Sequence, residues 1–249
     1  MCSRHEANAD AGVKYKLPAT GGTGVKVTLH KPWLGGLLAL AVVVYVSMWL
    51  GWSMPWHWVV AFDDAALAVT HRFGLAHPGW ITSWDVFCTA FSPTTFRALT
   101  LGLIVWALMR GQRRLALFLF VSVELSAVLT EVAKAAANRP RPATMMVAAT
   151  STSFPSGHAL GTMVAVLALL VVALPLARPT FRRWLIGAGV VIVLAVGAGR
   201  VMLNVHNPSD VLAGWALGYV YFVGCLLLLL VPWRVKATVE IPATRGSGP

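Results

Sequence analysis

Charged side chains are scarce in this sequence, and their scarcity restricts the class of protein. They make up 12% of the 249 residues, against 57% for hydrophobic residues, and the mean hydropathy is +0.72. A soluble globular domain carries roughly 25% charged residues. The composition therefore argues against a soluble domain and predicts an integral membrane protein.

Cysteines are also few, and metal-binding spacings are missing. The three cysteines lie far apart and form no C-x-x-C pair: Cys2, Cys88 and Cys225. This pattern argues against a disulfide framework and against a thiolate metal site. The sequence contains no H-E-x-x-H pair of histidine ligands either.

Acidic residues number nine against 20 Lys and Arg, which gives a net charge of +11. A basic balance of this size would suit nucleic acid, but the sequence has no basic stripe interleaved with aromatic residues. Basic residues that flank membrane segments explain the charge. We therefore expect no nucleic acid partner.

Long apolar runs are what the sequence does have. A helix needs about 20 apolar residues, with a range of about 17–25, to cross the hydrocarbon core. The second candidate segment is short and contains Arg97, whose side chain would have to extend to the membrane surface. An earlier start, near Trp84, would lengthen this helix. We predict an all-α, polytopic membrane protein with six transmembrane helices, at 33–52, 94–109, 115–133, 158–176, 185–203 and 211–231.

The segments outside these helices differ in character. The first 32 residues are polar and glycine-rich, and the apolar stretch after them is too long for a signal peptide. The segment 53–93 mixes Trp and His with Asp63 and Asp64, which suits an amphipathic element at the interface. The predicted division is a disordered cytoplasmic tail (1–32), a first transmembrane helix with an extracytoplasmic interfacial loop (33–93), a core of five transmembrane helices (94–231) and a cytoplasmic C-terminal tail (232–249).

Lysine and arginine are distributed unevenly between the two ends of these helices. Five precede the first helix, three lie in 110–114, three in 177–183 and three follow the last helix, which accounts for 14 of the 20. The positive-inside rule places this side, with both termini, in the cytoplasm. The remaining six are then extracytoplasmic: Arg72, Arg97, Lys134, Arg139, Arg141 and Arg200.

The predicted topology brings polar residues from the ends of four helices to that same face. The helices at 115–133 and 185–203 end there, and those at 158–176 and 211–231 begin there. Structural accidents that are independent of one another should fall on both faces, so the grouping indicates a site. Its members are Lys134, Arg139, Arg141, Ser156, His158, Arg200, His206 and Asp210.

Taken singly, each of these residues has a structural explanation. Ser156 fits the N-cap of the helix that follows it, and Lys134 can pair with Glu131 one turn earlier. The arginines can anchor helix ends at the interface. In "HNPSD" (206–210), the residues after His206 fit a capping box. These explanations do not account for three or four cations that converge with two histidines.

The residue types at this face suit the binding and transfer of a phosphate. Several cations beside a helix N-terminus bind a dianion, and arginine adds bidentate contacts. His206 is followed four residues later by Asp210, which can fix its tautomer, so it is a candidate nucleophile. His158 can protonate a leaving oxygen. A metal site is the rival use of the two histidines with Asp210 and Glu131, but the neighbouring cations would repel a divalent ion.

Three ordered motifs carry a resemblance to a known family. They are K-x6-R-P (134–142), P-S-G-H (155–158) and R-x5-H-x3-D (200–210). Together they resemble the type 2 phosphatidic acid phosphatase, or lipid phosphate phosphatase, superfamily, which is related to vanadium haloperoxidases and class A acid phosphatases. Gly199 stands where the family usually has serine, and Arg139 lies in the common "RPRP" variant of the first motif.

The resemblance implies an α-helical phosphatase core that needs no metal or cofactor and acts through a phosphohistidine. Carried over by position, it implies that His206 attacks phosphorus, Asp210 orients it and His158 protonates the leaving group. The phosphate-binding residues that it implies are Lys134, Arg141, Ser156, Gly157 and Arg200. Arg139 and Glu131 are further candidates for the site.

The function expected from this resemblance is a lipid phosphate phosphatase in the cell membrane, with its active site at the extracytoplasmic face. Phosphatidate, phosphatidylglycerophosphate and polyprenyl diphosphates all carry a terminal phosphate, and the sequence does not choose among them. One alternative is a phosphotransferase whose acceptor is not water, and another is a catalytically silent transporter-like or scaffolding protein. The six apolar spans argue against a haloperoxidase, because that branch is soluble.

Overall fold

The computed structural model describes residues 32–229, and within this range every regular element is a helix. This confirms the predicted all-α fold. The predicted tails at 1–32 and 232–249 lie outside the described residues, apart from Pro32, where the first helix begins.

Six helical segments in the described range are long and apolar enough to cross a membrane, as predicted. They are Gly35–Ser53, Pro78–Met109, Arg113–Ala137, Gly157–Leu176, Pro179–Met202 and Pro208–Leu229. The helices that form them are α1 (Pro32–Ser53), α3 (Pro78–Ala90), α4 (Pro93–Met109), α5 (Arg113–Leu119), η1 (Phe120–Glu124), α6 (Ser126–Ala137), α7 (Gly157–Leu176), α8 (Pro179–Met202) and α9 (Pro208–Leu229).

The second span begins earlier than the predicted residue 94, as the alternative start near Trp84 suggested. It consists of α3 followed by α4, with a short break at Phe91 and Ser92. Ser92 caps the new helix, because its hydroxyl accepts a hydrogen bond from the Thr95 N–H at 3.2 Å, and Pro93 occupies the first helical position, where no N–H is needed.

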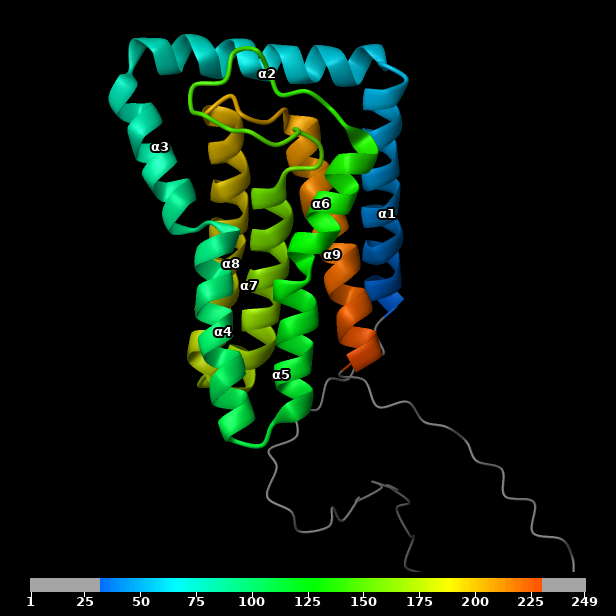
Figure 1. Cartoon of the computed structure of the whole chain (residues 1–249), viewed down its shortest axis with the longest axis vertical. Coiled ribbons are helices and arrows are strands. Elements are labelled where there is room, and N and C mark those ends of the chain that lie inside the picture. The colour runs from blue at the N-terminus through cyan, green and yellow to red at the C-terminus, as the bar shows by residue number, and fades with distance from the viewer. Residues whose placement is uncertain (1–31, 230–249) are drawn as a thin grey trace, which may run out of the picture.

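Helix α2 (His57–Ala76) lies across one end of the bundle (Figure 1). Its buried residues recur every three or four positions, so one face of the helix is turned towards the bundle: Val59, Asp63, Leu67, Thr70 and Gly74. Large apolar side chains on the other faces are exposed, among them Phe62 and Phe73. An amphipathic helix is therefore present within 53–93, and its location at the membrane interface stays a prediction.

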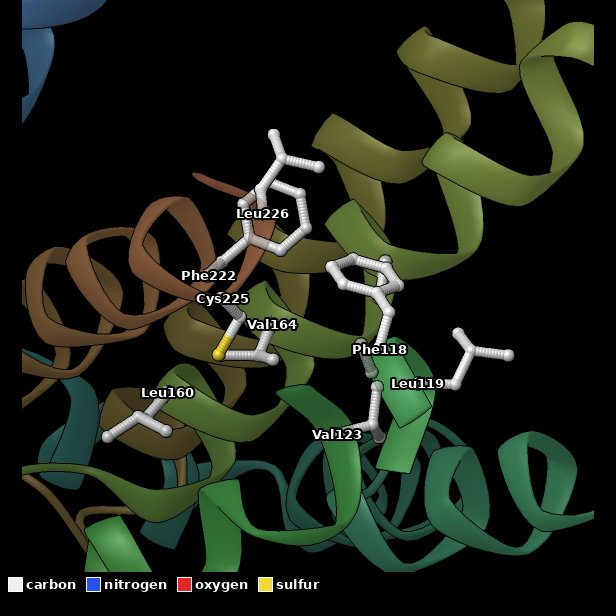
Figure 2. Packing of buried hydrophobic residues seen from close by; sticks show 10 residues of the cluster. Phe118, Leu119, Val123, Leu160, Val164, Phe222, Cys225 and Leu226 are labelled. Carbon is white, nitrogen blue, oxygen red and sulfur yellow. The ribbon is translucent and has the colours of Figure 1, made fainter. Parts of the chain in front are cut away.

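Helix α7 lies in the middle of the bundle and packs against α4, α6, α8 and α9. Side chains from α5, η1, α7 and α9 form the main core cluster, which is shown in Figure 2. In this cluster the rings of Phe118 and Phe222 meet edge to face, with centroids 6.2 Å apart. Because α7 and α9 pack against each other through these side chains, their N-termini lie side by side. There the Ser156 N–H donates a hydrogen bond to the Asp210 carbonyl at 2.9 Å.

The third span contains one turn of π-helix, η1, between α5 and α6. The Leu125 N–H donates to the Phe120 carbonyl at 3.2 Å, which is the i to i+5 pattern of a π-turn. The Val121 carbonyl inside this turn accepts a hydrogen bond from the Tyr221 hydroxyl of α9 at 2.5 Å. The irregular turn is therefore stabilised from the neighbouring helix.

Two connections lie at the same end of the bundle as α2: the loop 138–156 and the short loop 203–207 (Figure 1). Asn138 ends α6 in the left-handed conformation with φ of 46°, which asparagine tolerates well. Asn204 also has a positive φ, of 55°, and its side chain joins α2 to both loops. Its amide donates to Thr70 Oγ1 at 2.7 Å and its carbonyl oxygen accepts from Thr144 Oγ1 at 2.9 Å.

Candidate active site

A cavity of about 340 Å³ lies beneath the loop 138–156 and between α4, α6, α7 and α8. Polar residues from all three sequence motifs reach it. The predicted site residues that line the cavity are Glu131, Lys134, Arg141, Gly157, His158, Arg200 and His206. The structure therefore brings together groups that lie up to 75 positions apart in the sequence, between Glu131 and His206.

Lys134 and Arg141 are held on one wall of the cavity by the loop residue Ser151. Lys134 Nζ donates to Ser151 Oγ and to the Thr152 carbonyl, both at 2.7 Å. Arg141 Nε donates to the Ser151 carbonyl at 2.6 Å, and Nη2 donates to Ser151 Oγ at 3.1 Å. Neither cation has a carboxylate partner among the salt bridges of the described residues. Their positive charges are therefore free to bind an anion.

His206 is almost completely buried, with 1% of its surface exposed, and its two ring nitrogens have different surroundings. Nε2 lies 3.3 Å from Arg141 Nη1, at the wall of the cavity. Nδ1 lies 3.6 Å from Asp210 Oδ2, which is longer than a normal hydrogen bond. The nitrogen on the cavity side is therefore the one that can reach a bound phosphate.

The protonation state of His206 follows from its burial. Its pKa is lowered to about 4, mainly because burial removes the ring from water; the positive charges of Arg200 and Arg141 also lower the pKa, and Asp210 opposes them. An imidazole with this pKa is neutral near pH 7 and keeps a lone pair on one nitrogen. With a proton on Nδ1, facing Asp210, the lone pair is on Nε2, where it accepts a hydrogen bond from Arg141 Nη1 at 3.3 Å. A phosphate that binds Arg141 would take over this donor and leave the lone pair available.

His158 lies in the first turn of α7 and lines the cavity together with Gly157. The backbone N–H groups of a helix's first turn have no partners within the helix, so this end of α7 offers donors to an anion. Ser156 has another task. It is fully buried, and its hydroxyl accepts a hydrogen bond from the Ala159 N–H at 3.4 Å. The structure thus places Ser156 in the helix cap and not in the cavity wall.

Asp210 is enclosed by donors as well as by His206. Its Oδ2 accepts hydrogen bonds from the Asn207 N–H at 2.8 Å and from the Ser153 hydroxyl. The Asn207 contact is the capping-box interaction that the sequence suggested. Its Oδ1 accepts from Arg139 Nη1 at 2.7 Å. These hydrogen bonds and the positive charge of Arg139 stabilise Asp210 as an ionised carboxylate beside His206.

Residues 115–235 match the family model of the PAP2 superfamily. The chain carries a PAP2 superfamily domain. An undecaprenyl-diphosphatase from Sulfolobus acidocaldarius is 32% identical over 113 residues, which is 43% of this chain and 51% of that protein. The matched region thus spans about half the length of this curated relative.

A solved structure supports the same fold. The first transmembrane PAP2 type phosphatidylglycerolphosphate phosphatase from Bacillus subtilis superposes with a TM-score of 0.66 at 22% identity, covering 82% of this chain and 98% of that one. The likeness concerns the fold, and it covers a larger share of the chain than residues 115–235 do.

Arg139, a further candidate for the PAP2 site, does not line the cavity. Its guanidinium is buried on the far side of Asp210, where Nη1 also donates to Ser209 Oγ at 2.7 Å and Nη2 donates to Asp63 Oδ2 at 2.8 Å. It stacks over the Trp52 ring at 4.9 Å. Arg139 therefore holds Asp210 in position and does not reach the cavity.

Asp63 is one of the residues at this site that the sequence interpretation missed. It belongs to α2, is 1% exposed, and accepts hydrogen bonds from the Ser209 N–H at 2.9 Å and the Ser209 hydroxyl at 2.5 Å. The available signal was its spacing, because Asp63 falls four residues after Val59 and four before Leu67, on the buried face of the helix. Its neighbour Asp64 is exposed.

The glycine at position 199, where the family usually has serine, has a packing reason. A Cβ at Gly199 would lie 2.6 Å from Cys88 Sγ and 2.7 Å from Trp84 Cε3, both on α3. No side chain fits at these distances without displacing α3. The departure from the motif therefore follows from the close packing of α3 on α8, next to Arg200.

Arg97 of α4 and Glu131 of α6 also line the cavity. The expectation that the Arg97 side chain extends to the membrane surface is wrong, because it lines the cavity and its Nε atom is buried. Within residues 32–229, no group of three or more His, Cys, Asp or Glu side chains has a geometry suited to a metal ion.

Proposed function

We propose that this protein is a membrane-embedded lipid phosphate phosphatase that works through a phosphohistidine intermediate. The observation that carries the proposal is the position of His206 Nε2, at the wall of a cavity that is also lined by Lys134, Arg141 and Arg200. Within residues 32–229 these cations have no carboxylate partner in a salt bridge. A neutral imidazole beside them is suited to attack a phosphate, because the cations neutralise the charge that would otherwise repel the nucleophile.

The phosphoryl oxygens are bound by the three cations and by the N-terminus of α7 at Gly157 and His158. Arginine provides paired N–H donors and lysine a compact charge, so the set can contact all three non-bridging oxygens. The same donors bind the trigonal transition state, in which these oxygens lie in one plane. Ser156 contributes by capping the helix that presents the donors.

In the first step, His206 Nε2 forms a bond to phosphorus while the bond from phosphorus to the lipid oxygen breaks. His158 donates a proton to that oxygen, which leaves as the lipid alcohol or, from a diphosphate, as the lipid monophosphate. His206 becomes positively charged in this step. Asp210 stabilises the charge through the Nδ1 proton, and the separation of 3.6 Å is expected to shorten as the charge develops.

In the second step, a water molecule attacks the phosphohistidine. Neutral His158 accepts a proton from this water, and phosphate leaves as His206 regains its lone pair. His158 thus returns to its initial protonation state, and the cycle consumes one water molecule for each phosphate released.

The substrate class is a lipid with a terminal phosphate, and the active site faces the outside of the cell membrane. The cavity is lined in part by α4 and α6, which belong to membrane spans, so a headgroup can reach it from the bilayer. The relatives named above are an undecaprenyl-diphosphatase and a phosphatidylglycerolphosphate phosphatase. The 14-to-6 distribution of Lys and Arg supports the orientation, with both termini in the cytoplasm.

The test is phosphate release from a panel of lipid phosphates in detergent micelles with excess EDTA, with and without vanadate. The panel contains phosphatidate, phosphatidylglycerophosphate and a polyprenyl diphosphate, and His206→Ala is the control for contaminating phosphatases. We expect release from at least one lipid in EDTA and inhibition by vanadate, which mimics the trigonal phosphoryl group. Loss of release on chelation, with recovery on adding a divalent metal, would contradict the mechanism.

A further inference from the structure

Arg97 is a charged residue inside a membrane span that none of the three motifs includes. It lies in α4 and lines the same cavity as the catalytic histidines. Its Nε atom is buried and has no hydrogen-bond partner, and Arg97 takes part in no salt bridge within residues 32–229. Leaving a buried donor unpaired costs free energy, and intramembrane charges usually mark functional positions. The side chain therefore needs a ligand.

The position of Arg97 is fixed by the way α4 begins. Pro93 at the start of α4 lies directly against Gly161 of α7, where a Cβ would come within 2.7 Å of Pro93 Cβ. Gly161 is three residues after His158, on the adjacent turn of α7. Arg97 follows Pro93 by four residues, one turn along α4. The Arg97 guanidinium therefore lies on the side of the cavity where α4 packs against α7, the helix that contains His158.

This side of the cavity is where the leaving group must be. In an in-line displacement the leaving oxygen departs opposite the attacking nitrogen of His206, and His158 is the group that protonates it. The attacked phosphoryl group already has Lys134, Arg141, Arg200 and the α7 N-terminus. A lipid alcohol departs neutral and therefore carries no negative charge that a fourth cation on the leaving-group side could stabilise. A second phosphate in that position does carry such a charge.

We infer that Arg97 binds the second phosphate of a lipid diphosphate, so that the preferred substrate class is a diphosphate and not a monophosphate. The inference rests on the proposed function. His206 Nε2 forms its bond to the terminal phosphorus, the bond from that phosphorus to the bridging oxygen breaks, and the bridging oxygen remains on the departing lipid monophosphate. Arg97 stabilises the negative charge that develops there, and His158 supplies the proton.

Two acidic residues lie near Arg97 but form no salt bridge with it, so its guanidinium can still bind a phosphate. Glu131 lines the same cavity, and Glu124 of η1 has a buried Oε1 atom with no hydrogen-bond partner. Neither lies within salt-bridge distance of Arg97. Their negative charge stabilises the guanidinium and also limits the affinity for the lipid monophosphate product.

The experiment compares a polyprenyl diphosphate with the monophosphate of the same chain length, for the wild type, Arg97→Gln and Arg97→Lys. Arg110→Gln is the matched control, because Arg110 follows the opposite end of the same helix. We expect kcat/KM of Arg97→Gln to fall about 10- to 100-fold for the diphosphate, as for the loss of a hydrogen bond to a charged group. The monophosphate should change at most about twofold, and Arg97→Lys should recover part of the loss.

Two results would overturn the inference. An equal loss for both substrates would mean that Arg97 serves the attacked phosphate or the fold, and no loss for either would mean that it serves neither phosphate. Thermal unfolding of the variants in detergent separates a folding defect from a binding defect.

A binding measurement keeps the inference separate from the proposed hydrolysis. Calorimetric titration with inorganic pyrophosphate and with inorganic phosphate should show that Arg97→Gln weakens only the binding of pyrophosphate. If the wild type hydrolyses no lipid phosphate, the proposed function fails, and this titration still decides the assignment of Arg97. Equal weakening of both anions, or of neither, would contradict it.

Discussion

Arg139 and Asp210 form a buried ion pair, with Nη1 2.7 Å from Oδ1, on the side of Asp210 that faces away from the phosphate cavity. The other half of the guanidinium is paired with Asp63 of α2 at 2.8 Å. A buried arginine between two carboxylates satisfies its donors and fixes their positions. The orientation of Asp210, which faces the proposed nucleophile His206, thus depends on α2, the helix that lies across the end of the bundle.

Replacement of Asp63 by Asn should lower kcat by about 10- to 100-fold, because Asp210 and His206 would lose their alignment. KM should stay nearly unchanged, since the phosphate ligands are not disturbed. Steady-state kinetics on Asp63→Asn and on Asp64→Asn make the comparison, because Asp64 is adjacent and exposed. A larger rise in KM than fall in kcat, or the same effect in both variants, would argue against a positioning role for Asp63.

The two histidines should fail in different ways. His206→Ala removes the nucleophile and should abolish both the acid-labile phosphoenzyme and the product, whereas His158→Ala should slow turnover by about 10²–10⁴-fold. Asp210→Asn should lie between them. An aryl phosphate has a leaving group that needs little protonation, so it should rescue His158→Ala and not His206→Ala.

Trapping of a phosphoenzyme in His206→Ala would mean that the roles of the two histidines are reversed. Equal rescue of both variants by the aryl phosphate would also reject the assignment of nucleophile and acid. Quenching with labelled substrate, followed by gel analysis under alkaline conditions, distinguishes these cases.

His206 should titrate well below the usual histidine range, because burial lowers its pKa to about 4. The unfolded chain titrates near 6.5, so the folded state binds fewer protons between the two values. The contribution of His206 to stability is therefore fully present above about pH 6.5 and is lost as the pH falls towards 4.

NMR titration of histidine-labelled protein in detergent, without substrate, measures this pKa directly. His206→Ala identifies the signal. A His206 resonance that titrates near 6.5 would contradict the burial of its ring in a cationic site.

The orientation in the membrane can be tested with two single cysteines. Thr150 is exposed in the loop that covers the cavity, and Gln112 lies in the connection between α4 and α5, at the opposite end of the bundle. In a Cys2→Ser background, an impermeant maleimide should label Thr150→Cys from outside intact cells and Gln112→Cys only after permeabilisation. The reverse pattern would place the active site in the cytoplasm.

The sequence predicted the parts of this structure that depend on local pattern. Apolar runs define the six spans, and the motifs place His158, His206 and the cations at one end, because the alternation of spans leaves no other arrangement. Capping signals at Ser156 and in 207–210 were also local. The Ser156 hydroxyl caps α7, and the Asp210 carboxylate accepts from the Asn207 N–H as in a capping box.

The parts that could not be predicted depend on long-range packing. Arg139 and Asp63 are 76 positions apart, and nothing near Arg139 in the sequence shows that its guanidinium turns away from the phosphate. The same holds for Arg97, which reaches the cavity because α4 is seated against α7 at Pro93 and Gly161. Which partner a polar side chain contacts is determined by how the helices pack together.

The π-turn η1 sets the rotational register of the helix that follows it. Each residue of an α-helix turns the chain by about 100°, so the deletion of one residue within η1 would rotate α6 by about that angle. Lys134 would then leave the cavity wall, although every residue of the K-x6-R-P motif would still be present. An alignment of the motif residues alone does not show whether Lys134 faces the cavity. The direction of its side chain depends on the length of the segment between α5 and α6, which the Tyr221 hydroxyl contacts at Val121.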